Sequence, residues 1–405
     1  MSNKQKKSLV PEVRFPEFSD NGSWSRKKIG SALTLTLREK NKPSENYTGL
    51  GVRSHGKGTF LKYLEDPKKN AMNVLYEVHK DDLVVSITFA WEGALAIADQ
   101  DNHGALVSHR FPTYVFNREV ALPGFFKILI LDKLFIYRLG VISPGGAGRN
   151  RVLNKKDFLK LEVALPLVEE QQKIADCLAS IDELITLHTQ KLEALKDYKK
   201  GLMQQFFPTE GETMPKLRFP GFRAKGAWKI YPLGSVGENL DFKRVPITEK
   251  DRVKGDFPYY GASGVIDYVN DYIFDEKLLC ISEDGANLRA RTYPIAFSIT
   301  GKTWVNNHAH VIRFEHKSTQ TLVENYLNSV SLEDYLTGMA QPKLNRAKLD
   351  IIPIPLPSIE EQDVIADLLN SLDELVIHQA SMVENLAKYK SGLVQKLFPV
   401  MDEVN

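Results

Sequence analysis

The chain has 405 residues, which is enough for two or three domains that each bury a core. Apolar residues make up 43% and charged residues 26% of the chain, a composition that fits a globular protein and excludes wholesale disorder. No segment approaches the roughly 20 apolar residues of a membrane span, and residues 1–8 lack the apolar core of a signal peptide. We therefore expect a cytoplasmic protein with no membrane partner.

Charge and cysteine content exclude two further classes. The formal net charge is only +2, so the chain is not a polycation that coats nucleic acid through bulk charge. The two cysteines, Cys177 and Cys280, lie far apart and match no zinc or redox spacing. We expect both to be buried apolar side chains, with neither a disulfide nor a metal site.

A duplicated segment opens each half of the chain. Residues 10–31, VPEVRFPEFSDNGSWSRKKIGS, align with residues 214–235, MPKLRFPGFRAKGAWKIYPLGS. The alignment repeats Arg14, Phe15, Pro16, Phe18, Trp24 and Gly30. An internal repeat decides the whole architecture, so the two halves are expected to be two copies of one module.

The middle of each module differs from its counterpart. Apolar runs from Asp81 (DDLVVSITFAWEGALAIA) and Lys277 (KLLCISEDGANL) are broken by glycines and predict strands joined by turns. The middles are therefore predicted to be mixed α/β domains. Two domains that had simply drifted apart remain an alternative, although drift would also have blurred the repeated segments.

Each module closes with a second duplicated segment that predicts one long helix. Residues 165–208 and 356–399 align without a gap, and 22 of the 44 positions are identical. The match extends upstream to the segments that begin at Leu153 and Leu344. Each helix should start at the Glu-Glu-Gln after a proline, since carboxylates favour the positive helix end, and run about 40 residues, roughly 60 Å.

Apolar residues on alternating steps of three and four give each helix a coiled-coil seam that needs a partner. The two helices match in length and register, so we expect them to pair with each other, antiparallel, with His188 and Gln379 in one layer. Lys199 and Lys390 are expected to extend along the seam with their charges in solvent. The predicted seam is Ile174, Leu178, Ile181, Ile185, His188, Leu192, Leu195, Ile365, Leu369, Leu372, Val376, Gln379, Val383 and Leu386.

The repeat divides the chain into domain one at residues 10–152, a helical region at 153–208, domain two at 214–343 and a helical region at 344–399. Twin variable domains, a long helix after each, Glu-Glu-Gln at each helix start, and the Tyr-Lys-x-Gly-Leu motifs at Tyr198 and Tyr389 closely resemble the specificity subunit of type I restriction-modification systems. The resemblance covers nearly the whole chain. The entrance motifs LRFPGF at 217–222 and VRFPEF at 13–18 are its other specific feature.

The resemblance implies two target-recognition domains that read the halves of an asymmetric, bipartite double-stranded DNA target. The paired helices would set the distance between them and dock two modification (methyltransferase) subunits, with two restriction (ATP-dependent translocase and nuclease) subunits joining that core. S-adenosylmethionine, ATP and magnesium are expected on those partners, and no cofactor on this chain. Two different readers on one rigid spacer must in any case read two different half-sites.

Motifs for catalysis are missing from the sequence. Neither the Asn-Pro-Pro-aromatic loop of a methyltransferase nor a GxxxxGK[ST] phosphate loop occurs, and Gly301-Lys302-Thr303 lacks the required spacing. We therefore expect no catalytic residues. His308 and His310 form a weak candidate metal pair; two residues apart on a strand, they would face the same side and so both face DNA instead.

Candidate DNA contacts follow from the side chains that read base edges and phosphates. In domain one they are Arg53, Ser54, His55 and Lys57 in a glycine-rich loop and Ser108, His109 and Arg110 after a strand; an ordinary charged turn is the alternative. In domain two they are Tyr260, Ser263, Asn287, Arg289, Arg291, Lys302, Trp304, Asn306, Asn307 and His308, with Gln341, Lys343 and Arg346 near the second helical region.

Several of these candidates carry a second interpretation. Arg289 and Arg291 are expected to alternate onto one face of an extended segment. Tyr260 and Trp304 are equally compatible with a place in the core, the commoner fate of aromatic residues. Asn154 and Asn345 recur in both halves, so they cannot distinguish two half-sites and are assigned to phosphates or to structure. A coiled-coil scaffold without DNA specificity is the alternative function.

Overall fold

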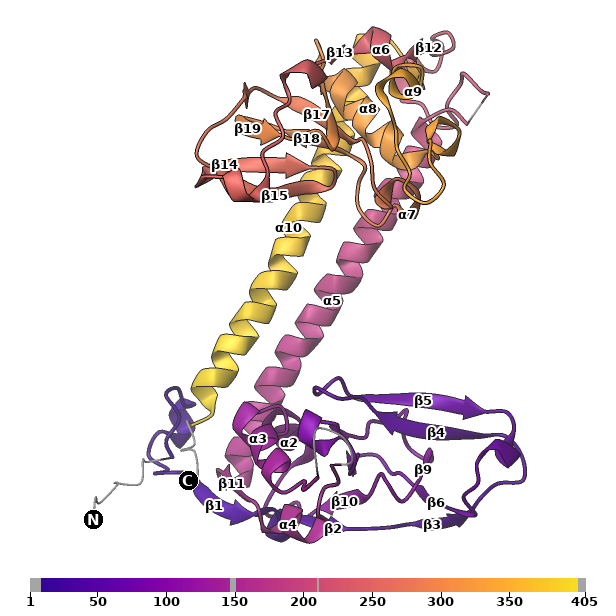
Figure 1. Ribbon diagram of the computed structural model, residues 1–405. Helices are drawn as coiled ribbons and strands as arrows, with labels where there is room; N and C mark the ends of the chain where they lie inside the picture. The colour runs from indigo at the N-terminus through magenta and orange to yellow at the C-terminus, as the bar shows by residue number, and fades with distance from the viewer. Residues whose placement is uncertain (1–8, 146–150, 210, 400–405) are drawn as a thin grey trace. The chain divides into compact units, whose positions relative to one another are not determined.

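The computed structural model describes residues 9–145, 151–209 and 211–399, so residues 146–150 of the expected first domain lie outside it. The chain forms two compact units (Figure 1). Unit 1 comprises Met1–Thr186 with Glu384–Asn405, and unit 2 comprises Leu187–Val383. Each unit therefore contains one globular part, a portion of one long helix and a portion of the other.

The two long helices are α5, Val168–Phe206, and α10, Ile359–Leu397, each of 39 residues. Both carry two glutamates in the first turn, as expected from the favourable interaction of carboxylates with a helix N-terminus. The prediction of two helices of about 40 residues is confirmed. None of the helices in the described part of the chain combines the length and apolar character needed to span a bilayer.

Each unit contains the same four-stranded antiparallel sheet. In unit 1 the strand order is β2-β10-β7-β8, and in unit 2 it is β13-β20-β17-β18. The strands of the first sheet are Leu33–Leu35, Thr113–Phe116, Leu83–Val85 and Leu95–Ile97; those of the second are Glu238–Asn239, Ala309–Arg313, Leu278–Ser282 and Ala296–Ile299. The divergent sequences thus fold on one repeated plan.

A second sheet in each unit repeats as well. It is β3-β6-β9-β4-β5 in unit 1 and β15-β14-β19-β16 in unit 2, with a parallel pair (β4 with β9, β14 with β19) beside a hairpin in both. The strands are Glu39–Asn41, Val74–Glu77, Leu106–Val107, Tyr47–Val52 and Thr59–Leu64, then Gly264–Val269, Lys254–Gly261, Lys302–Val305 and Phe274–Asp275.

Short helices and two terminal ribbons complete the units. The entrance strands β1, Ser25–Lys28, and β12, Lys229–Pro232, pair antiparallel with β11, Glu162–Leu165, and β21, Pro353–Leu356, the strands that precede the long helices. The remaining α-helices are α1 (Ile29–Ala32), α2 (Pro123–Leu129), α3 (Lys133–Val141), α4 (Lys155–Lys160), α6 (Leu233–Val236), α7 (Asn287–Ala290), α8 (Lys317–Ser329) and α9 (Arg346–Asp350).

The helices pair antiparallel within unit 2. The Gln379 amide donates to Nδ1 and to the backbone carbonyl of His188, both over 2.8 Å, while Lys199 contacts Asp373 at 2.5 Å. Partners on α10 move backward as those on α5 move forward, which defines an antiparallel pair. The expected fold, two α/β domains in tandem, each followed by a long helix that pairs antiparallel with the other, is confirmed.

The predicted seam residues line this contact to different depths. Those in the core or otherwise buried are Ile174, Leu178, Ile181, Leu192, Ile365, Leu369, Leu372 and Gln379; half-buried are Ile185, His188, Leu195, Val376, Val383 and Leu386. In unit 1 the apolar core that contains Ile174 and Leu178 of α5 also contains Leu397 of α10. In unit 2 the apolar core that contains Leu369 of α10 also contains Met203 of α5.

The two seam lysines differ from expectation. Lys199 pairs with Asp373 at 2.5 Å in unit 2, and Lys390 pairs with Asp182 at 2.6 Å in unit 1. The prediction that their charges lie in solvent is wrong, because each ammonium group forms an ion pair with a carboxylate on the opposite helix. Cys280 is buried, as predicted, whereas Cys177 is only half-buried against the core of unit 1 and is less deeply buried than predicted.

Candidate nucleic-acid interface

Equivalent strands of the two units are followed by loops of different length and sequence. The β4–β5 loop of residues 53–58 corresponds to the turn at 262–263 between β14 and β15. The β7–β8 loop of 86–94 corresponds to 283–295, and the β9–β10 loop of 108–112 to 306–308. These three loops carry most of the residues predicted to contact DNA.

In unit 1, hydrogen bonds join the first two loops. The His55 amide donates to the Glu92 carbonyl over 2.7 Å, the Gly56 amide to the Gly93 carbonyl over 3.1 Å, and the Ser54 hydroxyl to the Glu92 carboxylate over 2.9 Å. Gly93 has a φ of 75°, a left-handed conformation that favours glycine and turns the chain into β8. The glycine-rich loop is therefore held against the β7–β8 loop.

The third loop joins the same group. The Ile87 amide donates to the Arg110 carbonyl over 3.0 Å, and the Arg110 amide to the Ser108 hydroxyl over 3.3 Å. The structure thus brings the seven predicted residues of domain one onto adjoining loops: Arg53, His55, Lys57, His109 and Arg110 are exposed, while Ser54 and Ser108 are half-buried. Their role in DNA contact stays a prediction.

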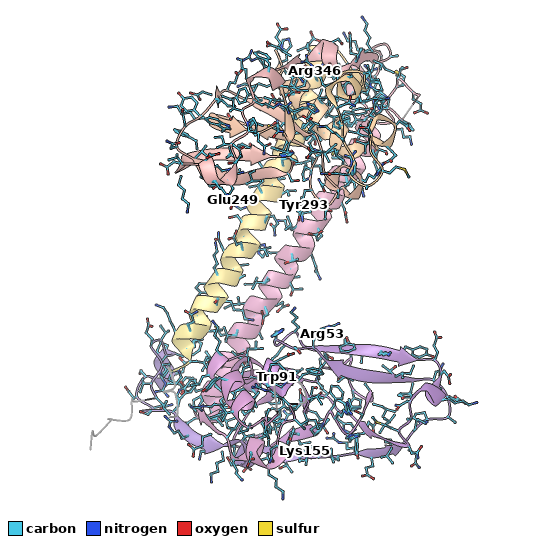
Figure 2. All side chains as sticks on the ribbon, in the orientation of Figure 1. Arg53, Trp91, Lys155, Glu249, Tyr293 and Arg346 are labelled. Carbon is cyan, nitrogen blue, oxygen red and sulfur yellow. The ribbon has the colours of Figure 1, made fainter. Side chains whose placement is uncertain are left out.

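A hollow of about 510 Å³ lies between these loops and the end of unit 1's helical layer. Its lining comprises His55, Gly56, Trp91, Glu92, Leu131 and Ile136. Figure 2 shows Arg53 and Trp91 on one side of unit 1 and Lys155, on α4, on the opposite side. The candidate surface is therefore remote from the helix that precedes β11.

In unit 2 the corresponding loops also bond to one another. The Glu283 amide donates to the His308 carbonyl over 2.9 Å, and the Gly285 amide to the Pro342 carbonyl over 3.1 Å. His308 Nδ1 lies 2.8 Å from the Asp284 carboxylate. This cluster brings together the exposed candidates Arg289, Asn307, His308, Gln341 and Lys343; the Ser282 hydroxyl donates to the Ala262 carbonyl, beside exposed Ser263.

The predicted alternation of Arg289 and Arg291 is wrong. Residues 287–290 form helix α7, and Arg291 ends it with a φ of 52°. The Arg291 guanidinium donates to the carbonyls of Leu327 and Val330, both over 2.9 Å, at the end of α8, and burial lowers its pKa. Arg291 stabilises the domain, while Arg289 stays exposed.

The prediction that His308 and His310 face the same side is also wrong. Strand β20 begins only at Ala309, so His308 lies in the preceding loop, whereas His310 is buried. The His310 ring lies 2.6 Å from Asp241 through Nδ1 and 2.8 Å from the Leu344 carbonyl through Nε2. The carbonyl can only accept, so Nε2 carries a proton that it donates there.

His310, Asp241 and Glu283 place three potential metal-ligand atoms within 4.8 Å of one another. Arg244 contacts both carboxylates, at 3.4 Å from Asp241 and 2.8 Å from Glu283, and Lys343 approaches Glu283 at 3.2 Å. Burial raises the pKa of both carboxyls, but hydrogen bonds and nearby cations outweigh it, and each pKa lies below its ordinary value. The group is a compensated ion-pair network.

The other candidates of domain two are placed as follows. Asn306 is buried, and its side chain accepts a hydrogen bond from the His308 amide, while the Trp304 indole donates to the Val245 carbonyl over 2.6 Å. Asn287 is half-buried and exchanges two hydrogen bonds with the backbone of Tyr293, and half-buried Tyr260 stacks on Phe297. Lys302 lies 4.8 Å from the Tyr272 ring centroid, and Arg346 lies on α9. Within unit 2, Arg346 and Tyr293 lie on opposite sides (Figure 2). Arg346 is therefore outside the loop cluster.

The repeated asparagines are structural. Asn154 Oδ1 accepts hydrogen bonds from the Lys156 and Asp157 amides, and the Asn345 side chain accepts one from the Lys348 amide. These are helix N-caps, which satisfy amides at the start of α4 and α9. The structural role proposed for both asparagines is therefore confirmed, and a phosphate contact stays a prediction.

Sequence reasoning missed one feature that positions both candidate surfaces. Arg14 forms a bidentate ion pair with Glu170, at 2.8 and 2.6 Å, and Arg218 forms the same pair with Glu361, at 2.7 and 2.7 Å. All four side chains are less than a tenth exposed. The repeated Arg-Phe-Pro and Glu-Glu-Gln motifs are therefore one junction between each domain and its long helix.

Comparison with known proteins identifies relatives. The model of the family described as "Type I restriction modification DNA specificity domain" matches residues 58–197 and 225–382. A putative type I restriction enzyme specificity subunit of Haemophilus influenzae is 36% identical over 148 residues, which are 36% of this chain and 37% of the relative. The MjaVIII specificity subunit of Methanocaldococcus jannaschii is 28% identical over 281 residues, 60% of this chain and 63% of the relative.

The matches thus span less than two thirds of the length of these curated relatives. Among solved structures, the type I restriction-modification S subunit from M. genitalium has a TM-score of 0.63 at 15% identity and covers 97% of this chain and 100% of its own. A chain from a structure of the type I R-M system has a TM-score of 0.54 at 18% identity, with 94% and 98% covered. At these identities the likeness concerns the fold.

Proposed function

Because the chain belongs to the type I restriction modification DNA specificity domain family, we propose that it is the non-catalytic DNA-specificity subunit of a type I restriction-modification complex. It reads an asymmetric, bipartite double-stranded DNA target. It also scaffolds the two modification and two restriction subunits, which supply S-adenosylmethionine, ATP and magnesium chemistry. This chain binds none of these cofactors and breaks no bond itself.

One observation carries the proposal. The two units share the plan of both sheets, apart from the additional edge strand β3 in unit 1. The loops at equivalent positions nevertheless differ in length and in side chains: Arg53, His55 and Lys57 in one unit stand where Ala262 and Ser263 stand in the other. Base edges are distinguished by the donors and acceptors that a protein presents to them. A conserved frame with unlike loops therefore suits two different half-sites.

The test is genome-wide methylation mapping in a methylation-free host that expresses the chain with its cognate modification subunit. A split, asymmetric motif should appear only when this chain is present. Exchange of residues 214–343 for the same region of a relative should alter one half of the motif and leave the other. Equal methylation without the chain, or a motif unaffected by the exchange, would support the coiled-coil scaffold without DNA readout instead.

A further inference from the structure

The β7–β8 loop of unit 1, residues 86–94, lies between the two loops that carry the predicted DNA contacts. Its Glu92 and Gly93 carbonyls accept hydrogen bonds from the His55 and Gly56 amides, and its Ile87 amide donates to the Arg110 carbonyl. We propose that this loop reads the first unit's half-site, with the Phe89 ring against the 5-methyl group of a thymine. The inference rests on the proposed function and names a residue for it.

Topology supports the assignment. The loop leaves β7 and returns through β8, as residues 283–295 leave β17 and return through β18 in the equivalent sheet. In unit 2 that connection carries Arg289 and bonds to the loop of His308. The same position in unit 1 carries the sequence Ser-Ile-Thr-Phe-Ala-Trp-Glu-Gly, with two aromatic side chains, whereas residues 283–295 of unit 2 carry two acidic and two basic side chains.

Phe89 is presented by a fixed backbone. Its amide donates to the Ser86 carbonyl over 3.1 Å, and its carbonyl accepts from Glu92 at 3.0 Å and from Ala94 at 3.1 Å. The next residue, Ala90, is fully buried, whereas the Phe89 side chain is 50% exposed. A backbone held in this way loses little freedom on binding, and burial of the exposed half of Phe89 is favourable against an apolar partner.

The base edges exposed in the major groove offer one such partner, the thymine methyl group, which contacts apolar side chains including phenylalanine. Arg53, Lys57 and Arg110 are cationic and exposed on the two adjoining loops. Cationic side chains suit the phosphates that flank a base contact. The loop therefore combines one apolar contact to a base edge with positive charge around it.

The experiment measures binding of the purified complex of this chain and its modification subunit to duplexes that contain the mapped motif. Each thymine of the half-site is replaced singly by uracil, which lacks only the methyl group. Loss of one buried methyl should weaken binding of the unaltered complex about fourfold at one position. Phe89→Ala should bind the thymine duplex more weakly by a similar factor and show no further loss with uracil.

The matched control is Tyr63→Ala, because Tyr63 is an aromatic residue that is 58% exposed and lies on β5, five residues beyond the end of the 53–58 loop. Its complex should keep the full response to uracil. The inference is overturned if no thymine of the motif responds to uracil, if Phe89→Ala keeps the whole response, or if Tyr63→Ala loses it equally. A complex that does not prefer the motif over a scrambled duplex would instead refute the proposed function.

Discussion

The backbone amide of Val13 donates a hydrogen bond to the carbonyl of Lys396 over 3.0 Å, which ties the entrance of unit 1 to the end of α10. Unit 2 repeats the bond at the equivalent residues, from Leu217 to the Gln205 carbonyl over 2.9 Å. The second bond joins residues close in sequence, whereas the first joins opposite regions of the chain. The end of α10 is thus a structural part of unit 1.

This relationship predicts that Phe398→Ala destabilises unit 1 selectively. The Phe398 ring lies 5.1 Å from that of Phe125 and 5.6 Å from that of Trp24, between centroids. Truncation of a packed phenylalanine costs about 3 kcal/mol. Hydrogen exchange should show reduced protection of β10 and α2 with β17 and β20 unchanged; equal loss in both units would contradict the expectation.

The junction between Arg14 and Glu170 predicts a large effect from a single charge. Glu170→Gln leaves the Arg14 guanidinium buried without its carboxylate, and breaking a buried pair in this way costs about 3–5 kcal/mol. The measurement is the free energy of unfolding in urea, followed by circular dichroism. Glu361→Gln should behave alike in unit 2, because Arg218 makes the same pair.

The neighbouring glutamates supply the control for this prediction. Glu169 and Glu360 precede the paired residues in the same helix turn and are exposed. Substitution of either by glutamine should change stability by less than about 0.5 kcal/mol, as is usual for surface positions. If the exposed and buried glutamates proved equally costly to replace, loss of helix N-terminal charge would explain the effect better than the ion pair.

The long helices were predictable because their signals are local. A heptad pattern sustained from Ile174 to Leu195, with a proline before and after the helix, depends only on neighbours in sequence. The pair of Arg14 with Glu170 was not predictable, since it joins residues far apart that follow no spacing rule. Repetition of both motifs was the one signal that linked them.

The candidate site could be predicted only in part, because only some of its signals are local in the sequence. Glycines marked the loop of Arg53 and His55, but nothing local showed that residues 86–94 lie between it and Arg110. The error at His310 came from extending strand β20 over residue 308, and the rule of alternate faces holds only inside a strand. The sequence therefore predicted that a strand exists here, but not the residue at which it begins, and this error in the boundary assigned His308 to the wrong face.

The ion-pair network around His310 predicts acid sensitivity of unit 2. The pKa values of Asp241 and Glu283 lie below their ordinary values of 3.8 and 4.5, so their stabilising contribution is complete above those values and is lost as the pH falls through the folded pKa. Asp241→Asn should cost about 3 kcal/mol at pH 7. It should also make stability fall less steeply below about pH 4 than in the unaltered chain.

Urea unfolding at several pH values measures this difference. Glu249→Gln, which removes one exposed carboxyl from the same unit, controls for the change in net charge. The network would be shown to be unimportant if Asp241→Asn and the unaltered chain lost stability in parallel from pH 7 to acid.

Two buried tyrosines predict opposite effects of one substitution. The Tyr114 ring is fully buried beside Phe158, and within the described residues its hydroxyl has no hydrogen-bond partner, while burial raises its pKa. Tyr259 is as deeply buried, but its hydroxyl accepts from the Ile247 amide over 2.9 Å. Tyr114→Phe should therefore stabilise the protein by about 1 kcal/mol, and Tyr259→Phe should destabilise it by about as much.

Thermal unfolding distinguishes the two variants, since a change of 1 kcal/mol shifts the midpoint by about 2–4 °C in a domain of this size. Both substitutions keep the ring and remove only a hydroxyl, so packing contributes equally to each. A fall in the midpoint for Tyr114→Phe as large as that for Tyr259→Phe would mean that the Tyr114 hydroxyl is hydrogen-bonded in solution. The opposite signs arise because an unpaired buried hydroxyl retains its desolvation cost, which a phenylalanine does not have.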